Sequence, residues 1–396
     1  MKTATITWIT HNNYGTMLQA YGLQQCLRQM GVSNDIISDR KIIHEPAPIA
    51  AQELSAVQAP VVADNKGMVR RIKKYALNPG EFMHALRGYC IDKQYTRDVQ
   101  MFAEYQRPFD VFKNERLDII CGLRREDMAS LNENYDAFVC GSDQIWSVLE
   151  QNFDGYFYLD FARKKKIAYA PSIGTDQIDQ DHRQQITAWL RDYCAISVRE
   201  KQSAAQLSEF TQQDVAWVAD PTLLHDSAFW AEFSANAYVP SSKYLLCYFL
   251  ADKPWYYEYA HAMAKHLKVK LLLIPSNPKQ LHRKERCRQP VGPEEFVSLI
   301  RHAQYVLTDS YHGSIFSMLF QRNFTYLKRF ADTDPACQNI RIYSLFEKAG
   351  LTDRIVENKK FEAADVRPID YTKVDSILQD FRNHSREFLQ NALLNI

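Results

Sequence analysis

The sequence predicts an α/β fold made of two open parallel-sheet domains that face each other across a ligand cleft. Short strand-like runs alternate with longer helix-like stretches along the chain, which is typical of parallel sheets with crossover helices. The chain has 396 residues, roughly two to three times the usual domain length. A stretch rich in Ser, Ala and Pro, FSANAYVPSSK, interrupts the alternation at 233–243. We therefore expect an N-terminal Rossmann-like domain over 1–225 and a C-terminal one over 240–396.

The N-terminal domain is expected to open with a βαβ unit. TATITWIT at 3–10 and NDIISD at 34–39 have the composition of strands. Between them, residues 16–31 place apolar side chains on one helical face, and Gly31 ends the pattern. Further strands are expected where apolar runs enter small or polar turns, in YDAFVCGSDQIW, KKIAYAPSIG, DYCAISVRE and DVAWVADPTLL. The pattern weakens over about 45–115, which we interpret as an inserted helical, basic segment.

The C-terminal domain repeats the alternation more clearly. We expect strands in YLLCYFL, VKLLLIP, YVLTD and FTYLKRF, helices in PWYYEYAHAMAKHL, GPEEFVSLIRHA and SIFSMLF, and a further helix that follows Arg341 in NIRIYSLFEKAGL. In open α/β sheets, ligands lie beyond the carboxyl ends of the strands. The residues that follow the strands of both domains are therefore the candidates for a functional site.

Composition excludes several classes of protein. The chain is 46% hydrophobic and 24% charged, and its formal net charge is +1, so no global charge favours nucleic acid. The eight cysteines are scattered without a C-x-x-C pair, and the N-terminus enters a strand pattern without a secretory segment. No run is long and apolar enough for a bilayer, and no ligand cluster suggests a metal. We expect a soluble, cytoplasmic protein with reduced thiols, no metal and no cofactor.

Two strand ends of the N-terminal domain carry groups suited to a sugar. The turn after the third expected strand presents a hydroxyl, a carboxylate, an amide and an indole, namely Ser142, Asp143, Gln144 and Trp146. The turn after the first strand offers Asn13, Tyr14 and Gly15 ahead of a helix. The alternatives are structural: helix caps at both turns, and a Trp146 packed in the core.

The stretch YVLTDSYHGSIFSMLF is the most specific candidate in the C-terminal domain. Asp309 or Ser310 is expected to cap the helix that follows, and Gly313 permits close approach of a ligand. His312 at this turn can bind a phosphate or act as an acid or base near neutral pH. The alternative is a histidine satisfied by a backbone carbonyl.

Basic residues at other strand ends point to an anionic ligand. Arg199 ends a strand, Lys328 and Arg329 end another, and Arg341 is expected ahead of a helix. Each one alone is as readily explained as a solvated surface charge. The basic run KGMVRRIKK at 66–74 is usually a solvated helix face, and peripheral contact with an anionic membrane surface is a hypothesis for it.

Taken in chain order, these segments resemble the polysaccharide pyruvyl transferase family. The resemblance runs from NNYGTMLQAYGLQQ through GSDQIW, IAYAPSIG, SVREKQS and ADPTLL to GPEEFVSLIRHAQYVLTDSYHGSIFSMLF and IRIYSLFEKAGL. It covers nearly the whole chain except the weak stretch over 45–115. Small departures are Tyr311 where Phe is common, Ser147 where Asn is common, and Pro171 where a small residue is usual; they leave acceptor identity open.

The resemblance implies a GT-B-like fold, phosphoenolpyruvate as donor and co-substrate, and a sugar as acceptor. The sugar can belong to a lipid-linked oligosaccharide, and the product would be a cyclic pyruvate ketal in a capsule or exopolysaccharide, with release of phosphate. Arg199, His312 and Lys328 fall on the donor motifs, with Arg341, Ser310 and Gly313 beside them. His312 and Asp143 are the expected catalytic residues. Two alternatives stay open: a GT-B glycosyltransferase that uses a sugar nucleotide, and a non-catalytic glycan-binding protein.

Overall fold

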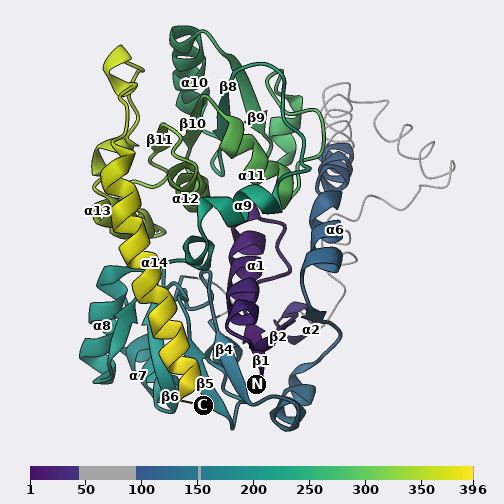
Figure 1. Ribbon diagram of the computed structural model, residues 1–396, viewed down its shortest axis with the longest axis vertical. Helices are drawn as coiled ribbons and strands as arrows, with labels where there is room; N and C mark the ends of the chain where they lie inside the picture. Colours follow the sequence, from purple (N-terminus) through teal and green to yellow (C-terminus); the bar gives the residue numbers. More distant parts are fainter. Residues whose placement is uncertain (44–94, 150–152, 396) are drawn as a thin grey trace, which may run out of the picture.

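The computed structural model describes residues 1–43, 95–149 and 153–395, and Figure 1 shows their arrangement. The basic run at 66–74, and most of the segment expected over 45–115, lie outside the described residues. The described end of that segment is helical at 95–105 and continues into α6 (Arg107–Arg116). Among the described helices, none combines the length and the apolar character needed to cross a membrane.

The N-terminal half is built on a sheet of seven parallel strands in the order β3-β2-β1-β4-β5-β6-β7. The strand order reverses between β1 and β4, as in a Rossmann-like sheet. The bounds are β1 (Lys2–Ile6), β2 (Ser33–Ile37), β3 (Ile119–Ile120), β4 (Ala137–Cys140), β5 (Lys165–Ala168), β6 (Tyr193–Val198) and β7 (Val215–Trp217). The helices of this half are α1 (Tyr14–Gln29), α2 (Arg40–Ile43), α7 (Gln180–Leu190) and α8 (Lys201–Thr211).

The C-terminal half carries a sheet of five parallel strands in the order β12-β11-β10-β8-β9. Here the order reverses between β8 and β10. The bounds are β8 (Tyr244–Tyr248), β9 (Lys270–Ile274), β10 (Tyr305–Thr308), β11 (Phe324–Leu327) and β12 (Ile355–Val356). The helices are α9 (Ser227–Phe233), α10 (Pro254–Leu267), α11 (Pro293–His302), α12 (Tyr311–Leu319) and α13 (Ile340–Ala349). Two parallel Rossmann-like sheets confirm the predicted α/β fold class.

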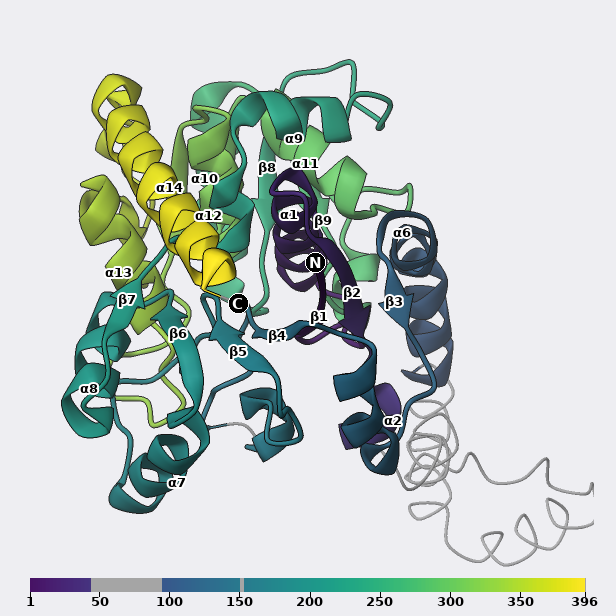
Figure 2. The same ribbon diagram turned by 60° about the horizontal axis from the view of Figure 1, so that its bottom comes forward.

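The last helix, α14 (Tyr371–Leu394), runs along both halves of the molecule (Figures 1 and 2). Leu389, Ala392 and Leu393 near its end share an apolar cluster with α1 residues, and Ser385 Oγ accepts a 2.8 Å hydrogen bond from Ala219 N. The end of the chain thus packs on the N-terminal half. The domain boundary expected between 225 and 240 stays a prediction.

Aromatic packing joins the two halves beside α1. Tyr14 stacks on Phe296 of α11 with ring centroids 4.4 Å apart, and its hydroxyl donates to Val291 O at 2.9 Å. Tyr14 is 3% exposed. We predicted Tyr14 as a sugar contact, and the structure instead places it in the apolar contact that holds the halves together.

Two helices of the C-terminal half begin at other residues than the sequence suggested. α12 begins at Tyr311, because the Ser310 side chain caps it by accepting from Gly313 N at 3.2 Å. His312 and Gly313 therefore belong to its first turn. α13 begins at Ile340, so Arg341 lies inside the helix and not ahead of it. The seven described cysteines are free, as expected for reduced thiols.

Candidate active site

The two reversals of strand order meet at one cavity of about 200 Å³. It lies beyond the carboxyl ends of β1 and β4 on one side and of β8, β10 and β11 on the other, where α/β sheets bind ligands. The N-terminal half contributes Trp8, His11, Asn13, Thr16, Asp143 and Gln144. The C-terminal half contributes Leu250, Asp309, Ser310, Tyr311, His312, Tyr326, Arg329, Phe330, Gln338, Arg341 and Ile342.

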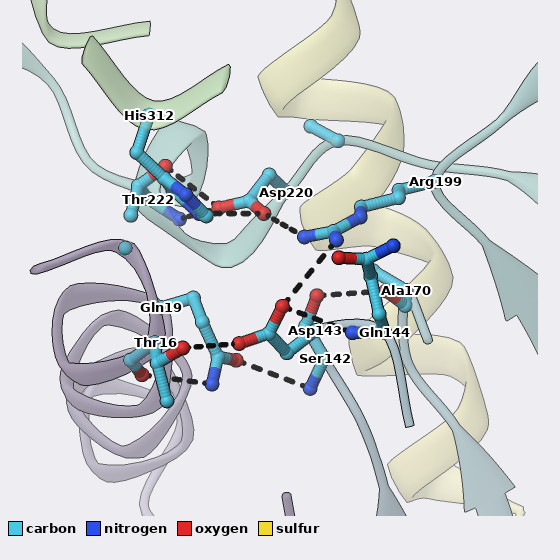
Figure 3. Close-up of polar contacts among 12 residues, drawn as sticks. Thr16, Gln19, Ser142, Asp143, Gln144, Ala170, Arg199, Asp220, Thr222 and His312 are labelled. Carbon is cyan, nitrogen blue, oxygen red and sulfur yellow. Dashed lines mark hydrogen bonds and ion pairs between the residues drawn. The ribbon is translucent and has the colours of Figure 1, made fainter. Parts of the chain in front are cut away.

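Helix α1 and the turn after β4 form the N-terminal wall. Asn13 caps α1 by accepting from Gly15 N at 2.8 Å and from Thr16 N at 3.3 Å. Thr16 Oγ1 donates to Asp143 Oδ2 at 2.6 Å, which ties the helix to the turn (Figure 3). Gln144 lines the cavity with a buried side-chain amide nitrogen that has no hydrogen-bond partner within the described residues. A bound polar group would satisfy that donor.

Arg199 lies behind this wall and does not line the cavity. Its side chain is 0% exposed and contacts three carboxylates: Asp220 at 2.9 Å, Asp143 at 3.5 Å and Glu200 at 3.6 Å. Burial works against the charged guanidinium, but Asp220 and Asp143 outweigh it and raise its pKa. We expected Arg199 to bind the donor; in the structure it joins carboxylates of the turns after β4 and β7 instead (Figure 3).

His312 lies between Asp220 and α1 at the edge of the cavity. Its Nε2 atom is 3.3 Å from Asp220 Oδ2, and a Cβ built on Gly15 would lie 1.9 Å from its Nδ1 atom. The imidazole therefore packs against a bare backbone on one side and a carboxylate on the other. Burial would raise the pKa of Asp220, but His312 and Arg199 outweigh it and hold that pKa below its ordinary value.

Arg329 and Arg341 are the guanidinium groups that line the cavity. Both donate to Gln338 Oε1, Arg329 at 3.4 Å and Arg341 at 2.9 Å, and among the described residues neither forms an ion pair with a carboxylate. Burial, Arg199 and Arg329 together lower the pKa of Arg341 to about 10. Both guanidinium groups thus face the cavity without a carboxylate in ion-pair contact, which favours an anionic ligand on this wall.

Asp309 is the carboxylate of the C-terminal wall. It accepts from the backbone N–H groups of Leu250 at 2.6 Å and Ala251 at 2.9 Å, just beyond β8. Burial raises its pKa to about 6, against the opposite effect of Arg329 and of those two N–H groups. The sequence offered Asp309 or Ser310 as the cap of α12, and Ser310 is the one that caps it.

Several other predicted site residues lie away from the cavity. Trp146 is fully buried, stacks on Tyr158 with centroids 4.8 Å apart, and donates from Nε1 to Phe157 O at 3.0 Å. Ser142 is also fully buried, and its Oγ donates to Ala170 O at 2.7 Å. Both residues thus use their polar atoms in the core: Trp146 packs there as the structural alternative expected, whereas Ser142 makes a core hydrogen bond and is not the helix cap of that alternative.

Lys328 and Gly313 also lie off the cavity. Lys328 Nζ is 2.7 Å from Asp332, in the turn after β11, and 3.1 Å from Glu357, directly after β12, and both carboxylates are exposed. Gly313 lies against the Thr308 side chain, which a Cβ would approach to 2.7 Å, so it serves the packing of α12 on β10. The neighbour of Lys328, Arg329, lines the cavity instead.

Trp8, Asp220 and Arg329 belong to the site region, but the sequence-based list of site residues did not include them. Trp8 lines the cavity two residues after β1 ends, and it was assigned to the strand itself. Asp220 follows β7 in the segment ADPTLL, where its carboxylate beside a proline was a usable signal. Arg329 was seen only as part of a basic strand end. The rule that ligands lie beyond strand ends applies to all three and would have found them.

The fold and this cavity define a two-sheet, GT-B-like protein whose ligand site lies between two Rossmann-like halves. A family model described as polysaccharide pyruvyl transferase matches residues 13–329. The chain therefore belongs to the polysaccharide pyruvyl transferase family, as its motifs indicated. A search of curated proteins finds no match.

The solved structures whose backbones align with this chain are distant from it in sequence. A putative UDP-N-acetylglucosamine 2-epimerase from Listeria monocytogenes is 10% identical, with a TM-score of 0.48 over 99% of this chain and 91% of that one. The UDP-GlcNAc 2-epimerase from Neisseria meningitidis, bound to UDP-GlcNAc, is 10% identical with a TM-score of 0.48 over 100% of both chains. The E. coli heptosyltransferase WaaC, with ADP-2-deoxy-2-fluoro heptose, is 10% identical with a TM-score of 0.40 over 96% and 99%. At these scores the likeness carries no argument about substrates.

Proposed function

We propose that this protein transfers the pyruvyl group of phosphoenolpyruvate to a sugar, forming a cyclic ketal during biosynthesis of a cell-surface polysaccharide. The observation that carries the proposal is the pair Arg329 and Arg341, which line one wall and, within the described residues, share a neutral amide oxygen and no carboxylate. Phosphoenolpyruvate carries a phosphate and a carboxylate, and planar guanidinium groups bind both in pairs of hydrogen bonds. Family membership supports pyruvyl transfer as the reaction.

The donor fits the C-terminal wall. Its anionic groups would lie on Arg329 and Arg341, and this contact would offset the burial and cation crowding that lower the pKa of Arg341. His312 would then be within reach of the enol carbons, since it lines the same cavity from the first turn of α12.

The acceptor fits the N-terminal wall. Asp143, Gln144 and Asn13 offer a carboxylate, an amide with an unsatisfied donor and a second amide, which are the groups that bind sugar hydroxyls. Trp8 lines the cavity on the same side and is only partly buried, so its indole can serve as the apolar platform for a sugar ring. This is the role that the sequence suggested for Trp146.

The reaction moves protons between His312, the sugar hydroxyls and the departing phosphate. A proton from His312 joins the terminal CH₂ carbon, which becomes a methyl group, while one sugar oxygen bonds to the central carbon. The bond from that carbon to the phosphate oxygen breaks, and the second sugar oxygen closes the ketal ring. Of the two hydroxyl protons lost by the sugar, one passes through His312 and the other leaves with phosphate. Asp143 orients the attacking hydroxyl.

Phosphate release from phosphoenolpyruvate, measured with and without a panel of aryl glycosides and followed by mass measurement of the product, tests the proposal. We expect release only with an acceptor, and a product that carries a pyruvate ketal. His312→Ala should lower kcat about 100- to 10,000-fold with donor affinity retained, whereas His384→Ala, at an exposed position of α14, should behave as wild type. Turnover of a sugar nucleotide with no phosphate release from phosphoenolpyruvate would overturn the proposal.

A further inference from the structure

We infer that Asp220 and Gly15 are positioning residues that fix the His312 ring, so that Nδ1 is the nitrogen that exchanges the proton with the ligand. The inference rests on the proposed function for the role of His312 in turnover. It concerns residues on three separate segments: the turn after β7, the first turn of α1 and the first turn of α12. The ring is held between the first two.

Asp220 is fixed by contacts to both of its oxygens. Oδ1 accepts from Thr222 N at 3.0 Å and from Thr222 Oγ1 at 2.7 Å. Oδ2 lies 2.9 Å from Arg199 Nη1 and 3.3 Å from His312 Nε2 (Figure 3). The side chain is 0% exposed, so no water replaces these partners at the surface. The carboxylate therefore presents a fixed negative oxygen to one nitrogen of the imidazole.

Gly15 leaves room for the other nitrogen. A Cβ at position 15 would lie 1.9 Å from His312 Nδ1 and 2.5 Å from Cε1, distances at which the ring would have to move. Position 15 is the second residue of α1, where the backbone is helical and alanine is intrinsically better than glycine by about 1 kcal/mol. The helical backbone at position 15 therefore does not require a glycine. The close approach of the His312 ring does require one, because it leaves no space for a Cβ.

The tautomer of a histidine is set by the partner of one of its nitrogens. His312 Nε2 is buried and meets no hydrogen-bond acceptor within the described residues, so Asp220 Oδ2, at an ion-pair distance of 3.3 Å, is the group that favours a proton on that nitrogen. Nδ1 is then the nitrogen that exchanges a proton with the ligand. It lies beside the start of α1, where Asn13 and Thr16 line the cavity. In the proposed reaction, Nδ1 accepts the proton of the attacking sugar hydroxyl and delivers it to the terminal carbon of phosphoenolpyruvate. Nε2–H stays in place throughout.

Asp220→Asn tests the first contact. We expect kcat to fall at least tenfold and by up to about 10⁴-fold, the loss typical when the carboxylate that holds the tautomer of a catalytic histidine becomes an amide, with the Kd for phosphoenolpyruvate within about threefold of wild type. In ¹⁵N-histidine NMR of the full chain, the His312 nitrogens should lose the pattern of a protonated Nε2 and an unprotonated Nδ1. Asp226→Asn is the matched control, because it makes the same change in a carboxylate that caps α9, accepts from Phe229 N at 2.9 Å and does not line the cavity. It should leave the NMR pattern and kcat near wild type.

Gly15→Ala tests the second contact. The melting temperature should stay equal or fall, because the overpacking of a buried ring offsets the gain in helix propensity; the His312 NMR signals should shift and kcat should fall at least tenfold. Adding His312→Ala to Gly15→Ala should cause no loss beyond that of His312→Ala alone, since both changes remove the same placed ring. Unchanged His312 signals in both Asp220→Asn and Gly15→Ala would overturn the inference. If wild type releases no phosphate from phosphoenolpyruvate, the proposed function fails, and the NMR pattern still decides whether the ring is fixed in this way.

Discussion

Lys328 and Arg329 are neighbours in the chain, but they have opposite surroundings. Lys328 contacts two exposed carboxylates at 2.7 and 3.1 Å, whereas Arg329 lines the cavity and donates to a neutral amide oxygen. The same contrast separates Arg199, which is enclosed by three carboxylates, from Arg341, which has none among its described partners. A cationic side chain is available to bind a ligand anion only where no carboxylate of the protein already pairs with it. The position of a basic residue at a strand end is therefore not sufficient to predict a binding role.

The largest expected effect comes from removing the balanced cation Arg199. Arg199→Met leaves the carboxylates of Asp220 and Asp143 buried without their shared partner, and breaking a buried ion pair in this way costs about 3–5 kcal/mol. We expect the free energy of unfolding, measured by urea denaturation without ligand, to fall by that amount. Arg341→Gln is the matched comparison at the unbalanced site, and it should change stability far less. Equal losses for the two variants would refute the contrast.

The unbalanced cations should carry donor affinity. Arg329→Gln and Arg341→Gln each remove a charge-assisted hydrogen bond to an anion, a loss of about 1.5–3 kcal/mol, which corresponds to roughly a 10- to 100-fold higher Kd for phosphoenolpyruvate. Lys328→Gln should stay within about threefold of wild type, because its charge is already balanced outside the cavity. Isothermal titration with phosphoenolpyruvate measures all three. A larger effect from Lys328→Gln than from Arg329→Gln would reverse the assignment.

The fold was predictable because its signals are local. Hydrophobic period and strand-end composition located the alternating elements, and Ser310 capped α12 as one of the two residues expected to do so. The choice between Lys328 and Arg329 was not predictable in this way. β11 ends at Leu327, and beyond a strand end the alternation of side chains no longer fixes which way each one points.

The residues that contact His312 could not be predicted from local sequence patterns either. Asp220 and Gly15 come from two other segments of the chain and meet His312 only once both sheets are assembled. The motifs of the family resemblance include all three segments, but they do not say which atoms meet. Tertiary packing supplies that information, and it also places Trp146 in the core, where one indole in a polar turn had looked like a sugar platform.

The pH dependence of donor binding sharpens the contrast between Arg341 and Arg199. The pKa of Arg341 is lowered from 12.5 to about 10, so its positive charge is present below that pH and is lost as pH rises through it. The pKa of Arg199 is raised, so Arg199 stays charged. We expect the Kd for phosphoenolpyruvate to rise above about pH 10, by up to roughly tenfold per pH unit, in wild type. In Arg341→Gln, the Kd should rise less steeply with pH than in wild type, because the titrating guanidinium is absent. The same slope in wild type and variant would contradict the assignment.

The two tryptophans extend the comparison to the acceptor wall with the smallest expected effect. Trp8 lines the cavity and is partly buried, whereas Trp146 is fully buried with its Nε1 bonded to Phe157 O. Trp8→Ala removes a sugar platform worth about 0.5–1.5 kcal/mol, so the KM for the acceptor should rise roughly 2- to 12-fold with the KM for phosphoenolpyruvate unchanged. Trp146→Phe should lower the melting temperature and leave the acceptor KM near wild type. If Trp146→Phe raised the acceptor KM more than Trp8→Ala did, the sugar would contact the β4 turn and not the end of β1.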